Sequence, residues 1–323
     1  MRKMLLSLNT LILRLKLINL VILNTTKTGT TMILKRVLSI GLLIVLNALS
    51  TSVFAQSSVW KVSKGDNYFY LGGTIHLLNP EDHPLPEEFT TAYKDADSLI
   101  FETDLAEAQS AEAQQKSLAV MAYSDGGTLK DDLSDESYSK LSDYLTSSGM
   151  PIQAFGQFKP WAVALTLTVM EYQKLGMQPD YGVDQHFNAK ALADNKAVGE
   201  LETFDEQLSF ISSMGDIDPN IMVEYTIRDL KELPGFVKSM KNNWRNGDIE
   251  AFSKESSIAT MKAEFPDLYD NLVVKRNNNW MPKLTALTGS KAKEFVLVGA
   301  LHLSDKEGLI NQLKLAGFTI DQL

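Results

Sequence analysis

The sequence predicts an α/β (α+β) fold with two pseudo-repeated β-turn-α-β halves that form a central sheet and a cleft, and with large helical insertions between them. Two apolar, strand-like runs lead to this prediction. The first ends in "YLGGTIH" at residues 70–76, and the second ends in "LVGALH" at residues 297–302. Each run closes on Gly, two further residues and His. Between them, residues 110–178 and 203–289 have mostly helical patterns.

Residues 32–55 resemble a secretory signal. Lys35 and Arg36 precede an apolar run of signal-peptide length, and Val53-Phe54-Ala55 has the small-residue pattern of a cleavage site. We therefore divide the chain into an upstream extension with signal peptide, residues 1–55, and one domain, residues 56–323. An N-terminal anchor that is retained is the alternative interpretation.

Residues 1–31 are apolar but make a poor membrane span, because Arg14 and Lys16 interrupt them. The sequence therefore predicts no stable membrane span once the signal has been cleaved. The chain has no cysteine, which excludes disulfides, thiolate nucleophiles, zinc-thiolate sites and a lipidated cysteine. An export signal without a span or a lipid indicates a periplasmic or secreted protein.

The 323 residues carry a net charge of −9, and all seven basic residues of the segment 1–55 lie outside the predicted domain. The domain alone is thus more acidic than the whole chain. An acidic surface repels phosphate backbones, whose binding depends on clustered Lys and Arg. We expect no nucleic-acid partner, and a peptide or small-molecule substrate instead.

Both halves of the predicted fold follow the same local order. In the first, residues 59–72 form two strands around the turn "KGDN", residues 87–96 a helix, and residues 98–102 a buried strand. In the second, a strand at 294–298 precedes a helix near 306–316, which ends at Gly317 before a final strand. A short strand within "AVGELET" separates the helical blocks, and Thr203 to Glu206 forms a capping box.

Two of the four histidines stand at the turns that end these apolar runs. His76 and His302 each follow a strand, at the carboxyl edge of the sheet, where open α/β sheets bind ligands. Glycine lets the backbone turn sharply just before each of them. The matching positions predict two imidazoles in one cleft. The alternative is that each is an ordinary hydrogen-bonded histidine at a strand end.

Three carboxylates are candidate partners of the imidazoles. Glu102 ends an apolar run and must be paired, metal-bound or protonated there, because an unpaired buried carboxylate is costly. Glu202 repeats this position in "GELETFDEQ". Asp184 follows Gly182 at a predicted helix start, where it can instead cap the helix. His186 lies inside that helix and is interpreted as a packing or supporting residue.

Arg276 and Asn277, in "VVKRNNNWMPKL", are the last candidates. Three consecutive Asn, 277 to 279, fit neither a good helix surface nor a simple turn. Arg and Asn together can bind an oxyanion or a carboxylate by charge-assisted hydrogen bonds. An exposed helix end is the alternative, and the residues alone favour it.

In this order and spacing, the stretches "GGTIH", "FETDL", "GVDQHF", "GELETFDEQ", "KRNNNW" and "VGALHL" resemble the TraB/GumN family over nearly all of residues 56–323. That family is similar to the TIKI metalloproteases, which cut the N-terminal region of Wnt proteins, and more distantly to erythromycin esterase-like hydrolases. The resemblance implies a divalent metal site in which His76, His302 and Glu102 are the ligands. Asp184, Arg276 and Asn277 match further polar positions of the family motifs.

The sequence and the resemblance together predict a secreted metal-dependent hydrolase, most plausibly a peptidase. Ligands without sulfur suit Mn, Co, Zn or Fe, and such an ion activates water and polarises a carbonyl. Asp184 or Glu202 is the candidate general base, and Arg276 with Asn277 the candidate oxyanion-binding group. Two alternatives stay open: a metal-free, esterase-like hydrolase with a histidine base, and a ligand-binding or regulatory protein without turnover.

Overall fold

The computed structural model describes residues 56–255 and 258–323. The signal peptide expected in residues 1–55 lies outside the described residues. Within the described ranges, no helix is both long enough and apolar enough to cross a membrane.

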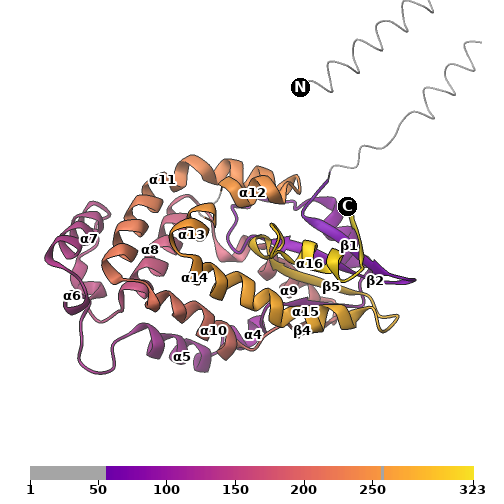
Figure 1. Cartoon of the computed structure of the whole chain (residues 1–323), viewed down its shortest axis with the longest axis horizontal. Coiled ribbons are helices and arrows are strands. Elements are labelled where there is room, and N and C mark those ends of the chain that lie inside the picture. Colours follow the sequence, from indigo (N-terminus) through magenta and orange to yellow (C-terminus); the bar gives the residue numbers. More distant parts are fainter. Residues whose placement is uncertain (1–55, 256–257) are drawn as a thin grey trace, which may run out of the picture. The chain divides into compact units, whose positions relative to one another are not determined.

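A six-stranded mixed sheet forms the centre of the fold, and it confirms the α/β class (Figure 1). Its spatial order is β4-β3-β5-β2-β1-β6. Strands β4, β3, β5 and β2 run parallel, whereas β1 is antiparallel to both β2 and β6. The strands are β1 Val59–Lys64, β2 Asn67–Thr74, β3 Ser98–Phe101, β4 Ala197–Glu200, β5 Glu294–Gly299 and β6 Thr319–Gln322.

The central strands follow from the apolar runs. β5 is buried from Phe295 onward, as expected of a parallel strand that is covered on both faces. The hairpin β1–β2 turns as predicted, with Gly65 at a φ of 65°, which glycine adopts without a steric penalty. The first and last strands of the described chain, indigo and yellow in Figure 1, lie in this one sheet.

Helices make up most of the remaining described residues, largely within the two blocks predicted to be helical. The longer ones are α3 Glu87–Asp95, α5 Ala111–Met121, α7 Asp135–Ser147, α8 Pro160–Lys174, α9 Val183–Ala193, α10 Phe204–Ser212, α11 Pro219–Arg245 and α15 Arg276–Leu287. Shorter ones are α4 Leu105–Ala108, α6 Leu129–Asp132, α12 Ile249–Glu255, α13 Ile258–Glu264, α14 Pro266–Tyr269 and α16 Leu309–Leu315. In the described part of the chain, the single-turn 3₁₀ segments are η1 Pro80–Asp82, η2 Ile152–Phe155, η3 Pro179–Tyr181, η4 Ser213–Asp216 and η6 Ala300–His302, and η5 Asp270–Lys275 is a π-helix.

The sequence predicts two helix ends correctly and is wrong at two others. The capping box at Thr203 begins α10, and Gly317 ends α16 with a positive φ. α16 begins at Leu309, later than predicted, because residues 303–308 still form the turn after η6. The exposed helix end that the residues alone favoured at Arg276 and Asn277 is wrong: α15 begins at Arg276, but both side chains are buried, because each contacts buried polar groups.

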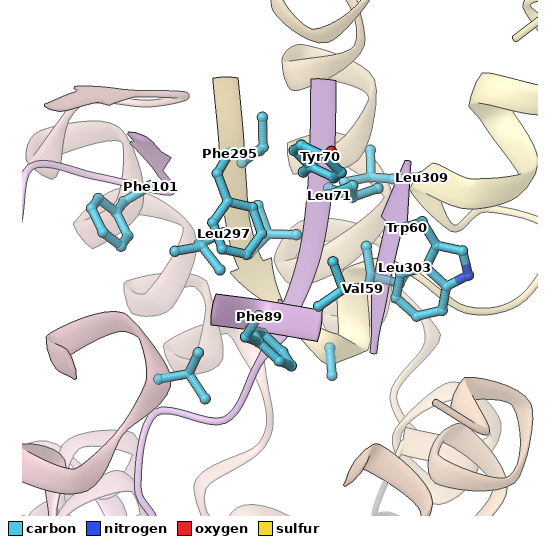
Figure 2. Close-up of a cluster of buried hydrophobic side chains, with 14 of the residues drawn as sticks. Val59, Trp60, Tyr70, Leu71, Phe89, Phe101, Phe295, Leu297, Leu303 and Leu309 are labelled. Carbon is cyan, nitrogen blue, oxygen red and sulfur yellow. The ribbon is translucent and has the colours of Figure 1, made fainter. Parts of the chain in front are cut away.

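The main apolar core covers the sheet. Figure 2 shows Val59, Leu71, Phe295 and Leu297 from strands β1, β2 and β5 grouped with Phe89 of α3, and all five are fully buried. A second apolar cluster lies between α7, α8 and α11. The first core fixes the strand ends at which the candidate site lies.

The two β-turn-α-β segments share a local order but use their last strands differently. β3, after α3, lies parallel beside β5. β6, after α16, pairs with β1 at the opposite edge of the sheet. A repeat of the two halves in three dimensions therefore stays a prediction.

Candidate functional site

The predicted site residues gather at one edge of the sheet, where the parallel strands β2, β5 and β3 end. His76 follows β2 and Glu102 follows β3, and β5 ends between them at Gly299. A cavity of about 310 Å³ opens at this edge. Its lining includes the polar His76, Glu102, Asp184 and Arg276 and the apolar Phe101 and Ile211. The location is the one at which open α/β sheets bind ligands.

His76 is oriented by Asp184. Its Nδ1 lies 2.8 Å from Asp184 Oδ2, and Thr74 Oγ1 donates to the other carboxylate oxygen at 2.9 Å. Attraction to Asp184 and the hydrogen bond with it raise the pKa of His76 above its ordinary value. The side chain of His76 is 60% exposed, so solvent weakens this attraction. Asp184 therefore does not cap α9, because both of its oxygens serve the residues after and within β2.

The start of α9 is pressed against the turn that carries His76. A Cβ on Gly182 would lie 2.1 Å from the His76 carbonyl oxygen, so only glycine fits here. The next residue, Val183, donates its N–H to the Ile75 carbonyl at 3.1 Å. This close approach places Asp184, in the first turn of α9, beside the imidazole.

The two motif histidines and Glu102 converge around Gly299. A Cβ built on Gly299 would lie 3.3 Å from Glu102 Oε1, 3.6 Å from His76 Nε2 and 3.7 Å from His302 Cδ2. Gly299 also donates its N–H to Glu102 Oε1 at 2.7 Å. The structure therefore brings together the three residues that the sequence predicted as metal ligands.

Arg276 fills the centre of the polar cluster below this point. Its Nη2 donates to Glu102 Oε2 at 2.5 Å and to Glu202 Oε1 at 2.6 Å, and its Nε donates to both oxygens of Glu202. Trp280 Nε1 donates to Glu202 Oε2 at 3.0 Å. The guanidinium and both carboxylates are buried, so each offsets the cost of burying the other charge.

The two glutamates differ in pKa. Burial opposes the ionisation of Glu102, but Arg276, with His76 and the N–H of Gly299, outweighs it and holds the pKa well below its usual range. Burial raises the pKa of Glu202, although Arg276 and Trp280 act in the opposite direction. Glu102 therefore stays charged beside the cavity.

His302 is buried and neutral. Its Nδ1 lies 2.8 Å from Asn277 Oδ1 and its Nε2 lies 3.1 Å from Arg276 Nη1. Because the guanidinium only donates, Nε2 accepts, and Nδ1 carries the proton. Burial lowers the pKa of His302 to about 3, with Arg276 and His76 contributing in the same direction.

As they stand, these residues do not fit the predicted three-ligand metal site. The one lone pair on His302 Nε2 already accepts a hydrogen bond from Arg276, so it cannot bind an ion at the same time. Within residues 56–255 and 258–323, no group of three or more His, Cys, Asp or Glu is arranged to hold a metal. His76 Nε2 and Glu102 Oε1 still face one space near Gly299.

The other predicted catalytic residues lie in the same cluster but away from the cavity. Asn277 is fully buried and donates to the carbonyls of His302 and Glu307, and Glu202 lies behind Arg276. Their roles as oxyanion-binding group and general base stay predictions. The sequence did not predict the contributions of Thr74 and Trp280. The one signal for the close approach of α9 to the turn that carries His76 was Gly182, two residues before Asp184.

Comparisons with known proteins identify the family of this chain. The chain is 26% identical over 250 residues to the uncharacterized protein YbaP of Escherichia coli K12, covering 77% of this chain and 89% of that protein. It has the same identity and coverage with the uncharacterized protein YbaP of Shigella flexneri. No solved structure matches the chain. The family model of the TraB/PrgY/gumN family matches residues 58–322, which include every predicted site residue, and the chain therefore belongs to this family.

Proposed function

We propose that this chain is a hydrolase whose reaction takes place in the cavity beside His76, on a peptide or a small uncharged molecule. The observation that carries the proposal is the His76–Asp184 pair at a cavity floored by charged Glu102 and Arg276. An imidazole oriented by a carboxylate at the carboxyl edge of a sheet is suited to move a proton to and from water.

In this reaction, His76 Nδ1–H donates to Asp184 while the lone pair on Nε2 takes a proton from water. The hydroxide that forms attacks the substrate carbonyl, and the imidazolium returns the proton to the leaving group. Asp184 stabilises the imidazolium while it exists. Arg276 acts indirectly, as a positioning residue, because its N–H donors are already bonded to Glu102, Glu202 and His302. It holds Glu102 in place next to Gly299.

A metal-dependent peptidase is the second candidate, and the convergence of His76, Glu102 and His302 around Gly299 favours it. When bound, a divalent ion would activate water and polarise the carbonyl. His76 and Glu102 would hold it, and His302 would join them only if Arg276 released its nitrogen. For this to happen, His302 Nε2 would exchange its hydrogen bond from Arg276 for a bond to the ion, with a rearrangement of side chains in the same cluster.

The test is hydrolysis of a panel of unstructured peptides and small esters, read by mass spectrometry. His76→Gln should lower the rate at least a hundredfold, since it removes the base but keeps a polar side chain of similar size. The wild-type rate should rise with pH as His76 loses its proton. Asp184→Asn should shift that rise to lower pH, because the attraction that raises the His76 pKa is gone.

Adding a chelator to the assay distinguishes the metal-free hydrolase from the metal-dependent peptidase. A rate that is unchanged by chelation and by added Mn²⁺, Co²⁺ or Zn²⁺ supports the His76 base, and a rate lost on chelation and restored by one ion supports the metal-dependent form. Hydrolysis that survives His76→Gln would contradict both. Tight ligand binding with no product after long incubation would show that the cavity only binds.

We also propose that the protein acts in the periplasm or outside the cell, on the basis of the signal pattern in residues 32–55. Protein from the native host should begin at Gln56 by mass spectrometry. An intact Met1 or Met32 terminus would contradict cleavage.

A further inference from the structure

The two histidines that the proposed reaction does not use lie against each other. His83 follows η1 in the loop after β2, and His186 lies in α9. The centroids of their rings are 5.2 Å apart and the ring planes are tilted by 54°. Neither ring lines the cavity beside His76. Both side chains are at least partly exposed, so a solute can reach them.

His83 is held so that one ring nitrogen keeps a lone pair. Its Nε2 lies 2.8 Å from the Tyr181 carbonyl oxygen, which only accepts, so Nε2 carries the proton and Nδ1 does not. Metal-bound histidines commonly donate their other N–H to a carbonyl or carboxylate in this way. The contact with Tyr181 therefore leaves Nδ1 unprotonated, with its lone pair available.

The backbone on both sides of His83 is also fixed. Arg245, the last residue of α11, donates to the Asp82 carbonyl at 2.8 Å and to the Pro84 carbonyl at 2.7 Å. His186 is placed by a regular helix whose start is packed against the His76 turn. Both rings thus come from ordered elements, and little has to be ordered when a ligand binds.

We propose that His83 and His186 form a surface site for a divalent transition-metal ion, with Zn²⁺ as its representative, and that water completes the coordination. Imidazole nitrogens bind Zn²⁺ at about 2.0–2.1 Å. Two such rings at a tetrahedral angle place their centroids about 5 Å apart, by the same bond length and the size of the ring. The observed separation of 5.2 Å matches this arrangement.

The charge state of His186 agrees with this site. Burial lowers the pKa of His186, and the neighbouring His83 and Lys190 contribute in the same direction, so the ring is neutral at pH 7. Among the described residues, no group hydrogen-bonds to the His186 ring. Neutral imidazole is the form that binds zinc, copper and nickel. The site is independent of the proposed hydrolysis, because it shares no residue with the His76 cavity.

The experiment is calorimetric titration of the purified chain with ZnCl₂, together with NMR of the ring nitrogens. The chain has only four histidines, so each ring can be followed separately. We expect zinc to shift the Nδ1 signal of His83 and a nitrogen of His186, and to leave buried His302 unchanged. His83→Gln and His186→Gln should each weaken zinc binding at least tenfold, and thermal unfolding without metal should match the wild type.

His76→Gln is the matched control, since it removes the exposed histidine of the cavity and should leave this zinc affinity unchanged. Loss of binding in His76→Gln but not in His83→Gln would place the ion in the cavity and overturn the proposal. Absence of any shift at His83 and His186 in the wild type would overturn it as well, whatever the variants do. Neither result depends on whether peptides are hydrolysed.

Discussion

Three of the four histidines have a hydrogen-bonding partner of their own, and the partner determines what the ring can do. A carboxylate beside His76 raises its pKa, whereas burial beside Arg276 keeps His302 neutral. A carbonyl fixes the proton of His83 on Nε2. The same residue type therefore serves as a candidate base, a buried acceptor and a candidate metal ligand within one domain.

The site leaves little room for a side chain at position 299, which is a glycine. Gly299→Ala would place a methyl group 3.3 Å from Glu102 Oε1 and 3.6 Å from His76 Nε2. The carboxylate must move by a few tenths of an ångström, which weakens its bond to the Gly299 N–H. We expect hydrolysis to fall about tenfold or more, while unfolding in urea shows a loss of stability below about 1.5 kcal/mol.

Gly235→Ala is the control for this substitution. Gly235 lies inside α11 with no atom near the position of its added Cβ, so alanine should stabilise the helix by about 0.5–1 kcal/mol and leave hydrolysis unchanged. Equal rates for Gly299→Ala and the wild type would show that the space around Gly299 is not part of the site.

At the scale of elements, three helices position the residues that follow the strand ends. α9 brings Asp184 to His76, and α15 brings Arg276 and Asn277 to His302. α11 fixes the loop after β2 through Lys241, whose Nζ donates to Asn79 Oδ1 and Asp82 Oδ2, both at 2.8 Å. The site is thus built between elements rather than within one.

Removing Lys241 should loosen that loop. The side chains of Lys241 and Asp82 are 17% and 16% exposed, so their ion pair lies between the surface and buried cases. Lys241→Met should cost about 2 kcal/mol in urea unfolding and speed hydrogen exchange in residues 76–86. Lys238→Met, an exposed position on the same helix, should change neither. Unaltered exchange in Lys241→Met would show that other contacts are sufficient to hold the loop.

At the scale of the whole domain, a second polar cluster joins the elements at the end of the sheet opposite to the candidate site. Asp95, the last residue of α3, accepts from Tyr68 at 2.7 Å, Tyr70 at 3.0 Å and Lys293 at 2.7 Å. The cluster joins β2 and α3 to the residue just before β5. Hydrogen bonds from Lys293 and Tyr68, with a smaller contribution from Tyr70, lower the pKa of Asp95 to about 2 against the opposing effect of burial.

This lowered pKa predicts a pH-dependent contribution to stability. The folded state favours the charged carboxylate, so the contribution is present above the ordinary pKa of Asp and is lost as the pH falls toward 2. Asp95→Asn should cost about 1 kcal/mol at pH 7, a value reduced for solvent screening at this partly exposed group. The difference from the wild type in urea unfolding should shrink between pH 4 and pH 3. A constant difference would assign the effect to packing instead.

The sequence by itself determined the α/β class, the strand that precedes each Gly-x-x-His turn, and most residues of the polar cluster, although not Thr74 and Trp280. Apolar runs, glycines at turns and strand-end carboxylates are local signals, so they can be recognised without knowing the fold. The order of the strands was not among these signals, and neither was the placement of β6 at the far edge, because pairing depends on residues distant in the chain.

Only the tertiary structure decided what each member of the cluster contacts. Asp184 could cap its helix or serve His76, and the close approach at Gly182 decided for His76. Arg276 could lie at an exposed helix end or in a polar site, and the structure buries it between Glu102 and Glu202. The pairing of His83 with His186 had no sequence signal at all. Charges and lone pairs are assigned by neighbours within a few ångströms, and those neighbours come from helices and strands that only folding brings together.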